Sequence, residues 1–219
     1  DEETGTFSFE MFGKNKHFYF EDLPKPALPG QHQYINFTTA IAAICAISEQ
    51  KPDSFQIDEK HIRKAIENID WPNRLEKVTG NLNKILNNPN SEIWIDGAHN
   101  VAGAFSVARW LEDKKNEDKT SKKTFLIAGF TKGKCKKEFL EQFKNITQEI
   151  IAVRVDGEPN PESSEIICEI AKSVGINSFP ADDLLDALYY IGKTTNFSDS
   201  RVIICGSLHL ARDVRKFSS

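Results

Sequence analysis

Long hydrophobic runs are absent from this sequence of 219 residues. No apolar stretch approaches the ~20 residues that a helix needs to cross a bilayer, so we expect no membrane partner. The formal net charge is −4, which argues against a nucleic-acid partner, because nucleic-acid-binding proteins usually carry a basic surplus. With 39% apolar and 27% charged residues, the composition is typical of a globular protein.

Paired cysteines and metal-ligand spacings are also missing. The four cysteines are far apart, and none belongs to a Cys-x-x-Cys pair. Cys45 and Cys205 lie in apolar runs and are predicted to be buried thiols, which is typical of a reducing compartment, so we expect a cytoplasmic protein. The five histidines show no metal-ligand spacing, and no metal site is predicted in this chain. It also lacks a Gly-rich phosphate-binding loop and a serine nucleophile elbow.

The first third of the chain has the pattern of an α+β domain. Thr4–Met11 and His17–Phe20 alternate apolar and polar residues and predict a β-hairpin. Apolar residues at helical spacing predict two helices, one from Gln31 and one over Ile57–Ile69. Because the sequence begins at Asp1, directly in this strand-like pattern, we expect a fragment of a longer protein.

From Glu92 onward, strands and helices alternate. Continuous apolar strands separated by helices are typical of a mostly parallel sheet that is covered on both faces. We place the domain boundary near residues 72–82 and divide the chain into domains 1–75 and 76–219. Strands are predicted over Ile93–Asp96, Thr124–Phe130, Glu149–Val155, Asn177–Phe179 and Arg201–Cys205, and helices over Gly103–Lys114, Lys136–Phe143, Ser163–Val174, Asp182–Thr194 and Leu208–Lys216.

Candidate site residues gather where the first of these strands ends. The apolar run Ile93–Ile95 is followed by Asp96, a glycine, His99 and Asn100, and then by a helical pattern. This places polar groups at the carboxyl end of a strand, where open α/β sheets bind their ligands, and at a helix start, which favours an anion. Asn100 as a simple helix cap and His99 as a surface residue are the alternative. Three different polar groups at one strand end favour a ligand site.

Two other segments carry candidate side chains. Ser207 follows the apolar run Val202–Cys205 at a second strand-turn-helix junction, and the two junctions would share one crevice if their strands are neighbours. A simple capped turn is the alternative there. Arg74 follows a rigid Trp-Pro bend at the domain boundary, where its guanidinium is suited to bidentate phosphate contact. A surface ion pair is the alternative for Arg74.

The remaining polar candidates are weaker by themselves. Asn36 lies one helical turn from His32 and Gln33, so the three can share a face, although polar residues that open a helix are usually caps. A local basic cluster is interpreted as a solvated loop, with phosphate contact as the alternative; it comprises Lys132, Lys134, Lys136 and Lys137.

Taken together, four motifs resemble the folylpolyglutamate synthase/dihydrofolate synthase family, relatives of the Mur peptide ligases. The resemblance covers essentially the whole chain, but only the C-terminal half of a full-length member. It implies that residues 1–75 close a central ATP-binding domain and that residues 76–219 form a Rossmann-like α/β domain. The motifs are Gly30-Gln31-His32-Gln33-Tyr34-Ile35-Asn36, Trp71-Pro72-Asn73-Arg74-Leu75-Glu76, Asp96-Gly97-Ala98-His99-Asn100 and Cys205-Gly206-Ser207-Leu208-His209-Leu210-Ala211.

The resemblance implies an ATP-dependent ligase, monomeric, that adds L-glutamate to dihydropteroate or folate through an acyl phosphate. It implies that Asn36 and Arg74 contact the nucleotide, with Arg74 stabilising charge on the phosphates. Asp96 would hold the ribose and help to join the domains. His99 and Ser207 would line the cleft near the incoming glutamate or the phosphate, which makes Arg74 and His99 the catalytic candidates. Mg²⁺ ligands are expected in the missing N-terminal part.

The chain departs from the family pattern in two respects. Val101 stands where the family commonly has proline, and we expect this to alter only the helix start. The family's phosphate-binding loop belongs to the N-terminal part, so this chain alone is expected to bind nucleotide weakly and to be inactive. A non-catalytic α/β module that binds a nucleotide or an amino acid is an alternative. A Mur ligase proper is another, which the Trp71–Arg74 motif disfavours.

Overall fold

The computed structural model describes residues 5–118, 122–133, 135–196 and 198–218. The chain divides into two compact units, Asp1–Trp71 and Pro72–Ser219, and each is described by itself. This division lies a few residues before the predicted boundary between residues 75 and 76. Thr4, at the start of the predicted hairpin, and Lys134, in the basic cluster, lie outside the described residues.

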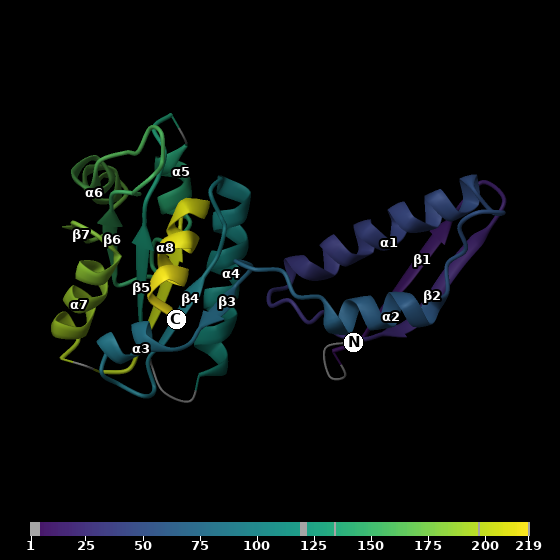
Figure 1. Ribbon diagram of the computed structural model, residues 1–219, viewed down its shortest axis with the longest axis horizontal. Coiled ribbons are helices and arrows are strands. Elements are labelled where there is room, and N and C mark those ends of the chain that lie inside the picture. Colours follow the sequence, from purple (N-terminus) through teal and green to yellow (C-terminus); the bar gives the residue numbers. More distant parts are fainter. Residues whose placement is uncertain (1–4, 119–121, 134, 197, 219) are drawn as a thin grey trace. The chain divides into compact units, whose positions relative to one another are not determined.

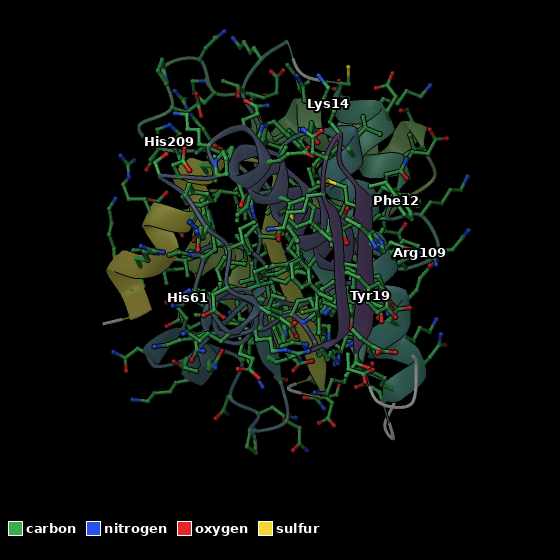
Figure 2. The ribbon with its side chains drawn as sticks, turned by 90° about the vertical axis from the view of Figure 1, so that its right-hand side faces the viewer. Phe12, Lys14, Tyr19, His61, Arg109 and His209 are labelled. Carbon is green, nitrogen blue, oxygen red and sulfur yellow. The ribbon has the colours of Figure 1, made fainter. Side chains whose placement is uncertain are left out.

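The first unit consists of a β-hairpin and two helices (Figure 1), as the alternation and the helical spacing predict. Its strands are antiparallel, and one face of the hairpin is apolar and buried while Phe12 and Tyr19 lie on the other, exposed face (Figure 2). The elements are β1 (Phe7–Phe12), β2 (His17–Leu23), α1 (His32–Gln50) and α2 (Glu59–Asn68). Their shared core is formed by Phe9, Phe18, Phe20, Leu23, Ile41, Cys45, Ile62 and Ile66.

The second unit is built on a six-stranded sheet in the order β3-β4-β8-β5-β6-β7. Only the pairing of β3 with β4 is antiparallel, and the other four pairings are parallel. The prediction of a mostly parallel sheet is therefore confirmed. The strands are β3 (Glu76–Val78), β4 (Glu92–Ile95), β5 (Lys123–Ala128), β6 (Glu149–Val153), β7 (Ser178–Ala181) and β8 (Ser200–Cys205).

Helices cover both faces of this sheet (Figure 1). Neighbouring strand residues alternate between the two cores: Leu126 packs with α4, α5 and α6, whereas Ile127 packs with α3, α7 and α8. The short helix α3 is not among the predicted elements, because its five residues are too few to show helical periodicity. The helices are α3 (Asn81–Ile85), α4 (Val101–Glu117), α5 (Lys136–Glu141), α6 (Ser164–Ser173), α7 (Leu184–Thr194) and α8 (Leu208–Ser218).

The strands β4 and β8 are direct neighbours, with Ile95 opposite Ile204. The backbone pairing continues one residue past β4, where Asp96 N donates to Ile204 O at 3.0 Å. Parallel strands end at the same edge of a sheet, so the two candidate strand-turn-helix junctions lie side by side at its carboxyl end. This adjacency, left open by the sequence, is settled by the strand order.

The opposite end of the same two strands holds a buried ion network. Arg201 is 2% exposed; its Nε donates to Glu92 Oε1 at 2.6 Å, and its Nη2 lies 3.0 Å from Asp118 Oδ2. Burial raises the pKa of the Glu92 carboxyl, but Arg201 with Lys122 and Lys77 outweighs burial, so this pKa is lowered. This ion network therefore lies at the amino ends of β4 and β8, opposite the end that carries the candidate site.

Two further expectations concern the cysteines and the membrane. All four cysteines are free thiols, and Cys45 and Cys205 are fully buried as predicted. Within the described ranges, no helix is long and apolar enough to cross a membrane.

The substitution Glu92→Gln should lower the free energy of unfolding by about 3 kcal/mol at pH 7, because it leaves the buried Arg201 guanidinium with one carboxylate partner. A carboxyl whose pKa is lowered in the folded state stabilises the fold above its unfolded pKa of about 4.3 and loses this effect as the pH falls further. The difference between wild type and variant should therefore shrink on acidification below that pH.

Urea-induced unfolding at a series of pH values measures this difference. Glu112→Gln, at an exposed position of α4, is the matched control and should leave the unfolding free energy unchanged. Equal stability of the wild type and Glu92→Gln at pH 7 would contradict the assigned role of the network.

Candidate functional site

Asp96, the first residue after β4, is buried with both carboxylate oxygens in use. Oδ2 accepts a hydrogen bond from Leu75 N at 2.9 Å, and Oδ1 accepts one from Ala98 N at 2.7 Å. Burial raises the pKa of the Asp96 carboxyl, and the two backbone hydrogen bonds and the positive charge of Arg74 offset part of this rise. Asp96 therefore ties the segment before β3 to the turn after β4.

The segment tied in this way presents Arg74. Its two neighbours, Asn73 and Leu75, have φ angles of 61° and 46°, a left-handed backbone that non-glycine residues adopt rarely. Asn73 N donates to Glu76 Oε2 at 2.8 Å, and Asn73 O accepts from Gly97 N at 2.8 Å. Arg74 itself is exposed and forms no ion pair with any residue that the structure describes. The turn thus presents a guanidinium that forms no salt bridge in the described chain and whose charge acts on the nearby Asp96 carboxyl.

Gly97 is required at this point by close approach. A Cβ on this residue would lie 2.8 Å from Arg74 Nη1 and 2.8 Å from Leu208 Cδ2. The missing side chain lets the guanidinium and the first residue of α8 lie against the turn after β4. Arg74 and the two candidate junctions therefore form one continuous surface.

His99 and Asn100 follow on the same turn. Asn100 Oδ1 accepts from Gly103 N at 2.9 Å, so Asn100 is the cap of α4, as the alternative interpretation holds. His99 is exposed, and its Nδ1 lies 2.9 Å from Gly97 O. This contact orients the imidazole and leaves Nε2 available for a ligand. The helix begins at Val101 itself.

Ser207 lies in the adjoining turn after β8. The two turns are joined by Gly206 N, which donates to Ala98 O at 2.7 Å. Ser207 is 3% exposed; its Oγ accepts from His209 N at 3.2 Å, which caps α8, and donates to Glu158 Oε2 at 3.2 Å. Ser207 therefore caps a helix and also contacts a carboxylate that belongs to a third turn, the one after β6.

Asn36 belongs to the first unit, at the start of α1. Its Nδ2 donates to Gln33 Oε1 at 3.0 Å, and Gln33 Nε2 lies 3.0 Å from His32 Nε2. The three side chains share a face, as predicted. The capping residue of α1 is Gln31, which makes no capping bond through its side chain, so these polar groups bond to one another instead of capping the helix.

The structure adds charged residues that the sequence does not reveal. Lys136, assigned to a solvated basic loop, is buried: Lys136 Nζ lies 3.0 Å from Glu162 Oε2, and both side chains are 8% exposed. The solvated interpretation is wrong for Lys136 and correct for Lys132 and Lys137, which are exposed. Glu158 is the other addition. Neither carboxylate belongs to a recognisable motif, and each meets its partner only through the fold.

No cluster in the described part of the chain has three His, Cys, Asp or Glu side chains placed to hold a metal ion. What the site offers instead is a guanidinium, an imidazole, a hydroxyl and two helix starts at one edge of the sheet. These groups suit an anionic ligand such as a phosphate or a carboxylate.

Comparison with known proteins places the second unit in a described family. Residues 79–217 match the family model described as dihydrofolate synthetase, C-terminal domain. A probable dihydrofolate synthetase of Schizosaccharomyces pombe is 26% identical over an alignment that covers 94% of this chain and 49% of that protein. The dihydrofolate synthetase of Saccharomyces cerevisiae is 24% identical, with 88% and 45% covered. The chain thus spans about half the length of the curated relatives it matches.

A solved structure agrees with this fold. The folylpolyglutamate synthase of Mycobacterium tuberculosis, crystallised with ADP and AMPPCP, superposes with a TM-score of 0.73 over 92% of this chain and 43% of that chain. The sequences are 20% identical. At this identity the likeness establishes the fold.

Two glycine substitutions should differ in their effect on the stability of the fold. Gly206→Ala should lower the free energy of unfolding by about 1–3 kcal/mol, because a side chain at φ +105° is strained and its Cβ would lie 2.5 Å from Gly129 O. Gly97→Ala should cost no more than about 1 kcal/mol, because it meets the movable ends of two side chains. Urea-induced unfolding measures both, and the reverse order of the two effects would contradict this account.

Proposed function

We propose, because this chain belongs to the dihydrofolate synthetase family, that it forms part of an ATP-dependent ligase that joins L-glutamate to dihydropteroate or folate. The chain spans about half of its curated relatives, so the reaction is proposed for the complete protein. In this proposal residues 1–75 close the ATP-binding domain and residues 76–219 form the glutamate-ligase domain. The protein is proposed to act as a monomer in the cytoplasm, and this chain alone is proposed to be inactive.

The reaction needs a carboxylate to be activated and an amine to be aligned with it. An oxygen of the pterin substrate's carboxylate attacks the terminal phosphorus of ATP, which releases ADP and leaves an acyl phosphate. The amine nitrogen of glutamate then attacks the acyl carbon, the carbon–oxygen bond to phosphate breaks with its electron pair, and the nitrogen loses a proton. Amide and inorganic phosphate result. Positioning and charge stabilisation are the protein's main contributions to such a reaction.

The observation that carries this proposal is that hydrogen bonds join three of the sequence motifs at the carboxyl edge of the sheet. Asp96 accepts from Leu75 N, and Ala98 O accepts from Gly206 N, so the segments around Arg74, His99 and Ser207 are held together. Arg74 forms no salt bridge in the described ranges, and its charge acts only at longer range on the buried Asp96 carboxyl, which favours a phosphate contact over a surface ion pair. We propose that Arg74 stabilises the negative charge that is redistributed over the phosphates.

The other roles follow from what each side chain already contacts. Asp96 uses both oxygens for backbone bonds, so any contact with a ribose hydroxyl would use the remaining lone pairs, and its main role is to hold the Arg74 turn. We propose that exposed His99 and the Ser207 hydroxyl face the acyl phosphate and the incoming glutamate. Asn36, at the exposed end of the hydrogen-bonded row on α1, is proposed as a nucleotide contact.

Nucleotide and metal complete the proposed site. The Mycobacterium tuberculosis enzyme was crystallised with ADP and AMPPCP, which supports ATP as the substrate. A divalent cation such as Mg²⁺ supplies neutralisation of phosphate charge when it is bound. Since the described residues offer no grouped set of ligands for it, we propose that its ligands lie in the part of the relatives that this chain does not span.

The experiment that tests the proposal starts from the native protein. An intact mass near twice 24.7 kDa would show that the native protein is about as long as the curated relatives. That complete protein should then form ADP only when both L-glutamate and dihydropteroate or folate are present. ADP formation that ignores either substrate would overturn the ligase assignment. A native mass near 24.7 kDa would favour the alternative, a non-catalytic module that binds a nucleotide or an amino acid.

Arg74→Ala in the complete protein should lower kcat by about 10²–10³-fold, as expected when one group that stabilises transition-state charge is removed. Gly97→Ala should also lower kcat, because the added Cβ would displace the Arg74 guanidinium. Arg109→Ala, an exposed arginine of α4 (Figure 2), is the matched control and should have no effect. A near-normal rate for Arg74→Ala with an unchanged fold would leave Arg74 as an ordinary surface residue.

A further inference from the structure

The loop between β6 and α6 brings a carboxylate to the turn after β8. Glu158 Oε2 accepts a hydrogen bond from Ser207 Oγ at 3.2 Å and lies 3.7 Å from His209 Nε2. Its side chain is 12% exposed. Glu158 therefore lies at the same edge of the sheet as His99 and Ser207, although it belongs to none of the sequence motifs there.

This carboxylate keeps spare capacity to accept hydrogen bonds. An ionised carboxylate has about four acceptor positions, and in the described part of the chain Glu158 uses one for the Ser207 hydroxyl, beside the longer contact with His209. A carboxylate that is largely withdrawn from water is unfavourable unless such positions are filled. A ligand ammonium group has three N–H donors and the opposite charge, so it is the complementary partner.

The loop that carries Glu158 is fixed on both sides. Before it, Arg212 Nη2 donates to Asp156 O at 2.9 Å. After it, Thr131 and Pro161 form a β-bridge, and the buried Lys136–Glu162 ion pair follows directly. These contacts hold the carboxylate in place before any ligand arrives, as substrate-positioning groups require.

The charges around Glu158 match those of an amino acid. An α-amino acid carries an ammonium and a carboxylate on the same carbon. Glu158 supplies the negative partner for the first. The start of α8, where Ser207 is the cap, supplies the positive end of a helix dipole for the second.

We propose that Glu158 binds the α-ammonium group of the incoming L-amino acid. This deepens the proposed function and rests on it, because the bound nitrogen is the atom that must reach the acyl phosphate. Glu158 then selects ligands that carry an amino group, and Ser207 and His209 orient the Glu158 carboxylate.

The test compares two ligands that differ only in the amino group. L-glutamate and glutarate are titrated separately into this ¹⁵N-labelled chain, without ATP or folate, and dissociation constants are taken from amide chemical shifts. The wild-type chain should bind L-glutamate roughly tenfold more tightly than glutarate, since a hydrogen bond to a charged group is worth about that much in affinity. Glu158→Gln should abolish the preference.

Glutamine keeps an oxygen that can accept from the Ser207 hydroxyl, so Glu158→Gln should fold as the wild type does, which urea-induced unfolding checks. Glu169→Gln, at an exposed position of α6, is the matched control and should keep the preference. A purely structural role for Glu158 would weaken both ligands equally, and that result would overturn the proposal.

Three other results would also overturn it: no binding of L-glutamate by the wild-type chain, equal binding of the two ligands, or a preference that survives in Glu158→Gln. Because no nucleotide is present, these results are independent of the ligase assay. Failure of ADP formation in the complete protein would overturn the proposed reaction. The proposed ammonium site at Glu158 would still be tested separately by the titrations.

Discussion

The buried carboxylate of Asp96 is the interaction on which the candidate site depends. It accepts one hydrogen bond from the turn before β3 and one from the turn after β4. These two bonds replace the hydrogen bonds with water that the carboxylate loses on burial. Without it, Leu75 N and Ala98 N would both lack a partner, and an unsatisfied buried donor is unfavourable by about 1–3 kcal/mol. The same carboxylate holds the left-handed residue Leu75, and Asn73 is held by its own bonds with Glu76 and Gly97.

The charged side chains at the two ends of β4 and β8 differ in how fully they are paired. At the start of β4 and β8, the guanidinium of Arg201 is enclosed between Glu92 and Asp118, and the network is closed. At the carboxyl end, Arg74 is exposed, and among the described residues Glu158 uses only part of its capacity to accept hydrogen bonds. A closed network stabilises one arrangement of the chain, whereas groups with remaining hydrogen-bonding capacity can receive a ligand. This contrast agrees with the general preference of α/β sheets for binding at the carboxyl edge.

The candidate residues are distributed unequally between the two units. The second unit, most of which matches the dihydrofolate synthetase C-terminal domain, brings together Arg74, His99 and Ser207 on its own backbone. The first unit carries Asn36 on a helix whose polar opening residues bond to one another. The matched relatives are about twice as long as this chain.

Local patterns in the sequence determined the hairpin, most of the helices and the parallel strands, because apolar periodicity directly reflects which face of an element is buried. They also located Asp96 and Ser207 at strand ends. They did not reveal α3, which is too short to be periodic, nor the burial of Lys136, whose partner Glu162 is distant in sequence. Only the tertiary structure placed β8 beside β4 and brought Glu158 to Ser207, because strand order and loop packing depend on contacts between distant segments, which no local pattern encodes.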